Sequence, residues 1–466
     1  HAGIATQYKV EQKLKKDGLN RFDLGREKFV EKVWEWKDQY EATILGQLKK
    51  LGVSCDWSRT RFTMDEGYSR AVLVAFKHYW DKGYIYQGER VVNWCPRCKT
   101  SLSDLEIEHE EEKAKLYWIK YGPFVLATTR PETKLGDTAV AVNPRDERYL
   151  AMIGKKYMIP GVLGEFEIIV VGDDAVDKEF GSGAVKVTPA HDFADYEIAQ
   201  RHNLPSKQII DEDGKMMTNC GKYAGLTTSE ARKAIVADME AMGLIDHIDD
   251  NYMHNSAHCY RCDTVIEPIP SKQWFLKMEE LIKPAIEAVE KGEVKIVPAQ
   301  FEKVALDWMK NIRDWCISRQ IWWGHRLPVW YKQTNKLKVK SEKLKVEESR
   351  QRQDDYTVSL ESPGEGYVQS EDVLDTWFSS ALWPFATLGW PESRNNADEK
   401  STRIDAEGKT DLEKFYPNSI NITDRGIINL WEVRMLFSGI EFMGEAPFHT
   451  IYINPTVFNK EGKRMS

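Results

Sequence analysis

The stretch Thr128-Thr-Arg-Pro-Glu-Thr-Lys-Leu-Gly-Asp-Thr-Ala-Val140 is the most informative part of this sequence. A second stretch follows it along the chain, Lys186-Val-Thr-Pro-Ala-His-Asp-Phe-Ala-Asp-Tyr196. Together they supply hydroxyl groups, a guanidinium and several carboxylates on segments that only folding can bring together. The pair therefore predicts a polar site assembled from distant segments.

Both stretches lie among short β-rich runs that are separated by turn residues. This pattern favours a compact barrel or sandwich module. A helix is expected to begin near Thr227, whose side chain can form a capping box with Glu230, and to end at Gly243. The predicted strands cover residues 116–121, 124–128, 139–142, 166–171 and 184–188.

Helical periodicity dominates the sequence on either side of this module. Apolar residues recur mostly three and four positions apart over 26–51 and again over 66–82, and a glycine follows or ends each run. Longer helical stretches return after Cys262. The β-rich module is therefore predicted to be inserted into a mixed α/β domain. Two polar tracts near 332–370 and 392–411 are expected to be solvated loops or surface insertions.

The composition is that of an ordinary soluble globular protein, with 42% hydrophobic and 30% charged residues. The chain contains no apolar run of about 18 residues and no secretory signal at its start, so a cytosolic protein without membrane spans is expected. The formal net charge of −8 argues against bulk electrostatic capture of nucleic acid, but a local basic face can still bind RNA. Net charge therefore does not decide whether RNA is a partner.

Four of the seven cysteines form two close pairs, Cys95-Pro-Arg-Cys98 and Cys259-Tyr-Arg-Cys262. In a chain without secretory signals, such pairs are typical of zinc ligands rather than disulfides. Four thiolates complete a tetrahedral site with no open position, so the expected metal is structural. One zinc ion would then clamp the entry and exit strands of the β-rich module. Reduced thiols without metal are the alternative.

The remaining cysteines and the nearby histidines show no such pattern. Small buried hydrophobic side chains are expected at Cys55, Cys220 and Cys316. Histidines close to cysteines are more often surface groups than metal ligands, and this applies to His109, His254 and His258.

The two opening stretches and three further blocks, in this order along the chain, resemble the valyl-tRNA synthetases, a class I family. The further blocks are His1-Ala-Gly-Ile-Ala-Thr-Gln7, Asp314-Trp-Cys-Ile-Ser-Arg-Gln-Ile-Trp-Trp-Gly-His325 and Asp372-Val-Leu-Asp-Thr-Trp-Phe-Ser-Ser-Ala-Leu-Trp-Pro384. The resemblance implies an α/β fold in which a partial Rossmann-like parallel sheet carries an inserted β-rich editing domain and a zinc-stapled connective region. The expected parts are the first catalytic part with the first zinc knuckle (1–115), the editing domain (116–255), the return stalk with the second knuckle (256–300) and the second catalytic part (301–466).

The resemblance also implies which residues form the editing pocket. A valine site cannot strongly reject threonine, which is nearly isosteric, so a second site hydrolyses mischarged threonyl-tRNA(Val). Asp195 and Asp192 would hold the ammonium group and the hydroxyl of the amino acid. The residues that complete the pocket would be Lys186, Thr188, Phe180, Arg130, Thr128 and Thr129. The expected nucleophile is a positioned water, helped by the ribose hydroxyl of the RNA, since no Ser-His-Asp or Cys-His triad is evident.

These groups also have structural interpretations. Asp192 and Asp195 could cap or solvate a helix that starts after His191, and Arg130 could lie in a surface turn. His191 is a tempting general base, but a core histidine satisfied by backbone groups is the more common role.

For the synthetic half, the resemblance implies binding of valine, Mg-ATP and tRNA(Val). Gly3 and Gln7 would lie beside the adenylate, and Trp377, Ile427 and Trp431 would wall the valine pocket, with core packing as their alternative role. ATP would be bound by Asp424, Arg464, Met465 and Ser466.

Three features depart from the family pattern. Thr423-Asp-Arg-Gly426 stands where the family usually has Thr-Gly-x-Asp, so the aspartate that meets the ATP ribose has changed places with a glycine. The tract 332–370 lacks the cysteines of a further zinc knuckle, so no second metal is expected. The chain also lacks the first ATP signature and stops within the second, which predicts deacylation of threonyl-tRNA(Val) without formation of valyl-adenylate.

The leading hypothesis is the central part of a monomeric, cytosolic valine-tRNA ligase with an editing domain. Isoleucyl and leucyl enzymes share the architecture but carry different residues after the threonine pair. A free-standing aminoacyl-tRNA deacylase would leave residues 1–90 and 300–466 without a role. A non-catalytic zinc-stapled RNA-binding module would leave the tryptophan pocket unexplained.

Overall fold

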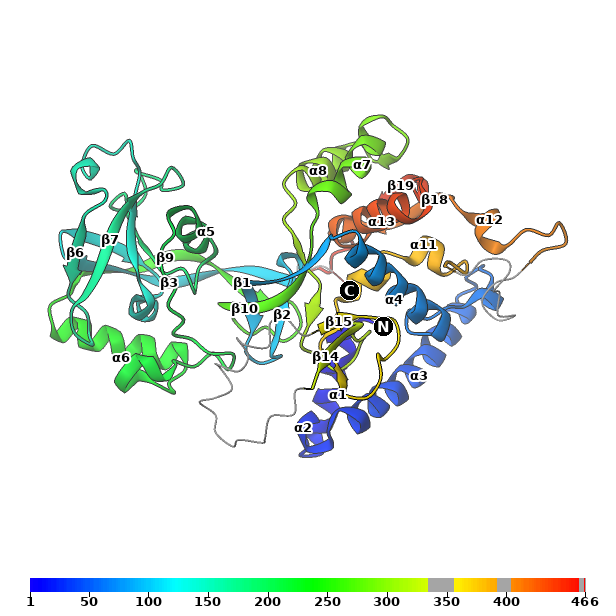
Figure 1. Cartoon of the computed structure of the whole chain (residues 1–466), viewed down its shortest axis with the longest axis horizontal. Coiled ribbons are helices and arrows are strands. Elements are labelled where there is room, and N and C mark those ends of the chain that lie inside the picture. Colours follow the sequence, from blue (N-terminus) through cyan, green and yellow to red (C-terminus); the bar gives the residue numbers. More distant parts are fainter. Residues whose placement is uncertain (334–355, 392–403, 461–464, 466) are drawn as a thin grey trace. The chain divides into compact units, whose positions relative to one another are not determined.

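The computed structural model describes residues 1–333, 356–391, 404–460 and 465. The chain divides into two compact units, a larger one made of His1–Gly88 and Trp274–Ser466 and a smaller one, Glu89–Gln273. It leaves the larger unit within strand β1 (Ile85–Cys95) and returns within β10 (Glu267–Leu276), and these strands are neighbours in a sheet of order β12-β10-β1-β2 (Figure 1). In sequence, the smaller unit is therefore an insertion into the larger one.

The first part of the larger unit is helical. Its helices are α1 (Gly3–Lys16), α2 (Arg21–Leu24), α3 (Arg26–Lys50) and α4 (Glu66–Asp81). Phe29 and Val33 on α3 and Val72 and Phe76 on α4 are fully buried, as their spacing requires. Asp65 begins α4 by accepting a hydrogen bond from the backbone N–H of Tyr68. The helices predicted over 26–51 and 66–82 are confirmed.

A parallel sheet lies in the second part of the larger unit. Its described strands run in the order β11 (Lys295–Val297), β19 (Phe448–Asn454) and β18 (Asn418–Asp424), and both pairings are parallel. The helices that pack with this sheet into one hydrophobic core include α7 (Glu279–Glu290), α8 (Gln300–Lys310) and α13 (Val433–Met443). Parallel strands with covering helices are the Rossmann-like arrangement predicted from sequence.

A small antiparallel sheet corrects one prediction. Strand β14 (Val329–Lys332) pairs with β15 (Tyr356–Val358) and β16 (Tyr367–Gln369), inside the tract expected to be a solvated loop. Val358 is buried, and the Tyr356 ring lies 5.2 Å from that of Trp274 in a T-shaped pair. Val358 and Tyr356 thus anchor this polar segment to the larger unit. Residues 334–355 and 392–403 of the two polar tracts lie outside the described residues.

Short elements complete the larger unit. They are β12 (Trp315–Cys316), β13 (Ser318–Arg319), β17 (Val373–Leu374), α10 (Thr376–Ser380), α11 (Trp383–Ala386) and α12 (Asp411–Phe415). None of the described helices is both long enough and apolar enough to cross a membrane.

The smaller unit is rich in β-structure and contains two main sheets. In one, the long strands β3 (Ile107–Tyr121) and β9 (Ile245–Cys259) pair antiparallel, and β4 (Phe124–Thr128) extends the sheet beyond β3. The other has the order β6-β7-β5-β8, formed by β6 (Lys156–Ile159), β7 (Phe166–Gly172), β5 (Ala139–Val142) and β8 (Ala184–Val187). The short strand β2 (Thr100–Leu102) pairs with the end of β1.

Two helices accompany these sheets, α5 (Phe193–His202) and α6 (Thr228–Ala241). The predicted capping box is present, because Thr227 accepts from the Glu230 backbone N–H while the Glu230 carboxylate accepts from Thr227. Each of the five predicted β-runs coincides with all or part of a strand. The β-rich character of this segment is therefore confirmed.

Candidate functional site

The two stretches singled out in the sequence meet in the smaller unit through strand pairing. The first ends in β5 and the second begins in β8, and these strands are antiparallel neighbours with Val140 opposite Lys186. A 3-10 segment, Pro131–Gly136, and the turn before α5 then place the polar side chains of both stretches near this pair of strands. Local β-structure thus assembles the site.

Asp137 is the centre of a buried hydrogen-bonded cluster. Its carboxylate accepts from the hydroxyl of Thr188 at 2.5 Å and from the hydroxyl of Tyr121 at 2.9 Å, and it lies 3.4 Å from the ammonium of Lys186. The Lys186 ammonium also donates to Thr188 Oγ1 at 2.6 Å and to Thr133 Oγ1 at 2.9 Å. One cation is therefore shared between a carboxylate and two hydroxyls.

Asp195 joins this cluster from helix α5. Its Oδ2 accepts a hydrogen bond from the backbone N–H of Thr188 at 2.8 Å, and the residue is only 6% exposed. Burial raises the pKa of the Asp195 carboxyl to about 7, and the neighbouring Asp192 carboxylate adds to the shift. A carboxyl poised near neutral pH is typical of functional sites.

Asp192 occupies the N-cap of α5. Its side chain accepts from the backbone N–H groups of Ala194 at 2.8 Å and Asp195 at 3.1 Å, and the residue is exposed. The capping interpretation of Asp192 therefore holds, whereas Asp195 lies inside the helix and is not its cap.

Arg130 is surrounded by carboxylates. It forms ion pairs with Glu267 and, at 3.5 Å, with Glu132, and it donates to the His191 carbonyl at 3.2 Å. Its backbone N–H donates to Thr128 Oγ1 at 3.0 Å. These contacts fix Arg130 beside the turn that leads into α5, and they contradict a simple surface-turn role.

His191 fills the role of a core histidine. Its Nδ1 lies 2.9 Å from the Pro268 carbonyl, and its Nε2 accepts from the backbone N–H groups of Ile209 at 2.9 Å and Ile210 at 3.3 Å. Burial first, and then the nearby Arg130 charge, lower the pKa of the ring to about 3. Both ring nitrogens are occupied by backbone groups, which leaves no position for accepting a proton from water.

The remaining predicted pocket residues are less enclosed. Thr128 and Thr129 are partly exposed at the end of β4, and Phe180 is 55% exposed in the turn before β8. Among the described residues, none of the hydrogen bonds of the Asp137 cluster involves Phe180.

Sequence reasoning missed two members of this region, Asp137 and Lys134. Both stand in the opening stretch, but neither charge was expected to be buried. Lys134 is 2% exposed, and its ammonium makes no hydrogen bond within the described residues. It lies 3.6 Å from the centroid of the Tyr121 ring, and burial lowers its pKa to about 7.

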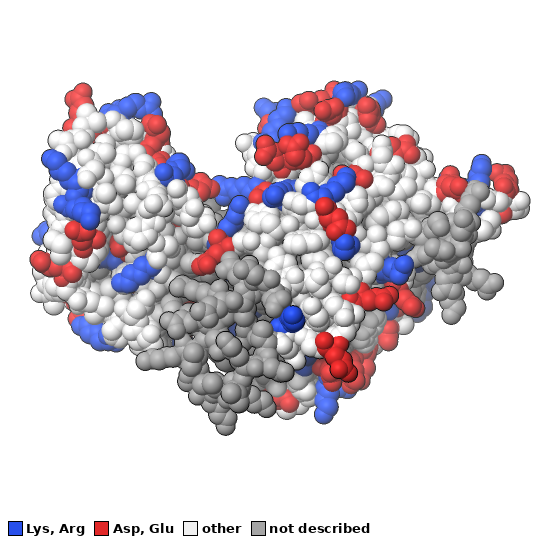
Figure 2. Space-filling view, viewed as in Figure 1, with Lys and Arg blue, Asp and Glu red and all other residues white. Residues whose placement is uncertain are grey.

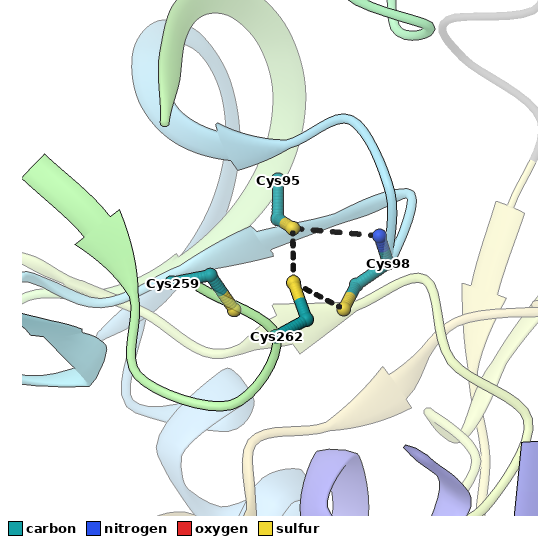
Figure 3. A group of neighbouring side chains, drawn as sticks. All are labelled: Cys95, Cys98, Cys259 and Cys262. Atoms are coloured by element: carbon teal, nitrogen blue, oxygen red, sulfur yellow. Dashed lines mark hydrogen bonds between the residues drawn. The ribbon is translucent and has the colours of Figure 1, made fainter. Parts of the chain in front are cut away.

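The four paired cysteines converge at one point of the smaller unit (Figure 3). Their sulfur atoms all lie within 4.8 Å of one another, with Cys262 Sγ 3.5 Å from Cys95 Sγ and 3.6 Å from Cys98 Sγ. A tetrahedral Zn–S₄ site with bonds of about 2.3 Å has sulfur–sulfur edges of about 3.8 Å. The arrangement therefore fits one zinc ion.

Both cysteine pairs adopt the same local turn. The residue after the second cysteine has positive φ in each, 54° at Lys99 and 59° at Asp263. Its backbone N–H donates to the carbonyl of the first cysteine at 2.8 Å in one turn and 2.9 Å in the other. Cys95 ends β1 and Cys259 ends β9, so the cluster joins the ends of these two strands.

The other cysteines only partly match their prediction. Cys220 is buried as expected, Cys316 is half-buried, and Cys55 is exposed, which contradicts its assignment to a core. His258 was assigned to the surface, and this is also wrong because it is 7% exposed.

In the larger unit, the residues predicted beside the adenylate contact the scaffold. Gln7 is buried, and its Oε1 accepts from the backbone N–H groups of Trp322 at 2.9 Å and Trp323 at 3.2 Å. The Gly3 N–H donates to Thr376 Oγ1 at 2.9 Å, and an added Cβ would lie only 2.9 Å from that oxygen. Gly3 is therefore required for this close approach.

The predicted valine-pocket residues are partly buried. Trp377 and Trp431 pack against the main core, and the Trp431 indole N–H donates to the Ser380 carbonyl at 3.0 Å. Ile427 ends a 3-10 turn, Arg425–Ile427, and is half-buried. Core packing and a pocket wall are both compatible with these positions.

Asp424 caps the turn that follows β18. Its Oδ1 accepts from the Gly426 backbone N–H at 2.7 Å and its Oδ2 from the Thr456 hydroxyl at 3.1 Å. Met465 is exposed, and Arg464 and Ser466 lie outside the described residues. In the sequence Thr423-Asp-Arg-Gly426, where aspartate and glycine have changed places relative to the family pattern, Asp424 therefore forms the turn.

Charge does not single out a nucleic-acid surface on the visible face. Figure 2 shows Lys and Arg side chains scattered among Asp and Glu on both units.

A family model described as tRNA synthetases class I (I, L, M and V) matches residues 1–466. The chain belongs to this family. Within it, the chain is 51% identical to the valine–tRNA ligase of Carboxydothermus hydrogenoformans over all of its length and 50% of that protein. It is also 51% identical to the valine–tRNA ligase of Thermotoga maritima, of which it covers 51%, and 48% identical to that of Syntrophotalea carbinolica, of which it covers 49%. The resemblance to valyl-tRNA synthetases is confirmed, and this class I synthetase chain spans about half the length of the curated relatives it matches.

Solved class I synthetases are only weakly similar in shape. A LeuRS–tRNA–LeuAMS complex from Agrobacterium radiobacter K84 has a TM-score of 0.39 at 16% identity, covering 98% of this chain and 59% of that one. A Mycobacterium tuberculosis methionyl-tRNA synthetase bound by methionyl-adenylate has a TM-score of 0.40 at 9% identity, covering 97% and 48%.

Proposed function

We propose that this class I synthetase chain is part of a valine-tRNA ligase and that its smaller unit hydrolyses mischarged threonyl-tRNA(Val). The observation that carries the editing proposal is the buried cluster of Asp137, Lys186, Thr188 and Asp195, built from the two stretches that resemble the editing pocket of this family. The whole of this chain is similar to about half of each valine–tRNA ligase, and this similarity supports the synthetic activity.

Threonine is the substrate that such a cluster suits. It differs from valine by a hydroxyl in place of a methyl group, and valyl-tRNA synthetase is the standard example of weak discrimination in a hydrophobic site, about a hundredfold. A second site must therefore favour the hydroxyl. The shared Lys186 ammonium and the hydroxyls around it offer polar partners that a valine side chain could not use.

Asp195 is proposed as the residue that fixes the amino acid. Its Oδ2 is held by the Thr188 backbone N–H, while Oδ1 has no hydrogen bond within the described residues. As a carboxylate, it would pair with the α-ammonium of threonine, with Asp192 adding negative charge at the helix start. Arg130, Thr128, Thr129 and Phe180 are proposed to position the terminal adenosine. A water molecule, assisted by the ribose hydroxyl, would attack the ester.

As part of the full-length ligase, we propose that the larger unit contributes to the two-step reaction of the family. Valine and Mg-ATP give valyl-adenylate and pyrophosphate, and the acyl group then moves to the terminal ribose of tRNA(Val). Gly3 and Gln7 would lie beside the adenylate, Trp377, Ile427 and Trp431 would contact valine, and Asp424, Arg464, Met465 and Ser466 would contact ATP. We propose a monomer that works in the cytosol, where its cysteines stay reduced.

We propose that the four cysteines hold a structural zinc ion. The sulfur separations and the matched turns support this assignment. Four thiolates leave no coordination position open, so the ion would stabilise the joined strands rather than take part in hydrolysis.

The editing proposal is tested with Asp195→Asn, which keeps the size of the side chain but removes its charge. We expect deacylation of threonyl-tRNA(Val) to fall by about 100-fold or more, with an unchanged circular dichroism spectrum. Asp174→Asn is the matched control, because Asp174 is an exposed carboxylate of the same unit.

The wild-type rate should also depend on pH. The raised pKa of Asp195 means that its carboxylate form is lost as the pH falls through about 7. The rate should therefore decline about tenfold per pH unit below that value, and the Asp195→Asn variant should lack this decline. Full activity of folded Asp195→Asn protein contradicts the pocket assignment. Valine-dependent ATP–pyrophosphate exchange by the full-length ligase tests the ligase reaction separately.

A further inference from the structure

A second cluster of possible metal ligands lies on the paired strands β3 and β9. In their register, Glu108 is opposite His258, Glu110 opposite Ser256 and Glu112 opposite His254. Alternate residues of a strand, and residues directly opposite each other, project to the same face of a sheet. Glu110, Glu112 and His258 therefore share one face, and one ligand atom of each lies within 4.8 Å of the others.

The orientation of His258 makes this cluster more than a patch of acidic side chains. Its side chain is 9% exposed, and its Nδ1 lies 3.2 Å from the Asp263 carbonyl. The opposite nitrogen, Nε2, is buried and makes no hydrogen bond within the described residues. It lies 3.1 Å from Glu112 Oε1, close enough for an ion pair but without hydrogen-bonding geometry.

This arrangement matches the way proteins prepare a histidine for a metal. A ligating imidazole almost always donates one ring N–H to a carbonyl or carboxylate, which fixes the tautomer and points the lone pair of the other nitrogen at the ion. Here the Asp263 carbonyl would accept the Nδ1 proton, and Nε2 is directed towards the two glutamates.

We propose that Glu110, Glu112 and His258 bind one divalent transition-metal ion, separate from the four-cysteine site. Imidazole with carboxylates suits Zn²⁺, Mn²⁺, Co²⁺ or Ni²⁺ better than Mg²⁺ or Ca²⁺, which prefer oxygen ligands alone. The negative charge of Glu110, Glu112 and the neighbouring Asp263 would attract the cation.

The two metal sites would differ in character. The four thiolates close their site, whereas three ligands from two strands leave coordination positions for water. Both glutamates are exposed, so the bound ion would exchange readily with metal ions in solution. This proposal departs from the sequence-based expectation of a single metal and does not rest on the proposed activities.

The test uses Co²⁺ added to the metal-free chain, followed by absorption spectroscopy. Cobalt on thiolates gives an intense charge-transfer band, while cobalt on carboxylates and imidazole gives only weak visible bands. We expect both signals in wild-type protein. The Glu110→Gln/Glu112→Gln double variant should keep the thiolate band and lose the second signal, with at least about a tenfold weaker affinity.

Glu108→Gln is the matched control, since Glu108 lies on the same face but outside the group of three. It should behave as wild type. The changed side chains are exposed, so the variants should fold, and circular dichroism checks this. The proposal is overturned if wild-type protein shows no non-thiolate cobalt signal, or if the double variant keeps that signal unchanged. Either result would leave His258 and Glu112 as an ion pair only.

Discussion

Two sets of buried polar groups, one in each unit, play different roles. In the smaller unit, the side chains of Asp137, Lys186 and Thr188 contact one another. In the larger unit, Gln7 accepts from two backbone N–H groups, and the Tyr68 hydroxyl donates to the Ser379 carbonyl at 2.7 Å. Polar groups of the second kind complete a scaffold. Those of the first kind form a shared electrostatic centre, which is what a binding site requires.

Removal of the proposed zinc ion should have the largest effect on stability. It tests whether the smaller unit depends on the cysteine cluster. Treating the protein with a chelator should lower the unfolding free energy of the smaller unit by several kcal/mol, less than the roughly 10–16 kcal/mol of zinc-finger peptides because the unit has its own hydrophobic cores. Hydrogen exchange should rise at residues 93–102 and 256–264.

The control for chelation is Cys55→Ser. Cys55 is exposed and belongs to the larger unit, so this change should leave metal content and exchange rates unaltered. Metal analysis that finds no zinc in protein purified without chelators, together with unchanged exchange, would count against the cysteine site.

The next largest effect is expected at Lys134, the buried cation without a hydrogen bond in the described structure. Lys134→Met should stabilise the protein by about 2–4 kcal/mol at pH 7, because the unfolded chain holds a proton that the native site disfavours. Native Lys134 binds fewer protons than the unfolded chain between its pKa of about 7 and the ordinary value of 10.5. Wild-type stability should therefore rise with pH in that window, and the gain from Lys134→Met should shrink.

Urea unfolding at several pH values measures this gain. Lys155→Met, at an exposed position of the same unit, is the control: it keeps Lys134, so its stability should rise with pH as in the wild type. A destabilised Lys134→Met protein at neutral pH would mean that the ammonium is a net stabilising part of the Asp137 cluster.

The smallest effect is expected at Tyr68 of the larger unit, whose hydroxyl satisfies a backbone carbonyl. Tyr68→Phe leaves the buried Ser379 carbonyl without its donor and should cost about 1–2 kcal/mol of unfolding free energy. Threonyl-tRNA deacylation should not change. Tyr40→Phe, at an exposed tyrosine, should be neutral. A loss of deacylation in Tyr68→Phe at full stability would mean that this scaffold group also affects the site, and it would contradict the comparison.

The elements that sequence periodicity defines were predictable. The spacing of Phe29 and Val33 marks the buried face of α3, and Thr227 with Glu230 marks the start of α6. The strands 356–358 and 367–369 were not predictable, because their pairing with β14 depends on tertiary contacts of a polar segment.

The candidate site was predictable only in part for a related reason. The stretches that form it stand out by resemblance, but the roles of individual side chains depend on what folding places beside them. Asp137 and Lys134 carry no local signal of burial, and the occupied ring nitrogens of His191 depend on the distant Ile209 and Pro268. His258 was assigned to the surface because the strand opposite it could not be known.

The strand pair that carries the chain between the units has a consequence for engineering. For the larger unit, everything from Glu89 to Gln273 amounts to one connection between the neighbouring strands β1 and β10. The entropic cost of closing a loop grows only slowly with its length. A folded unit can therefore be inserted into such a connection at little cost in free energy. The reverse operation should be equally mild: a short linker from Gly88 to Trp274 would remove the β-rich unit as a cassette.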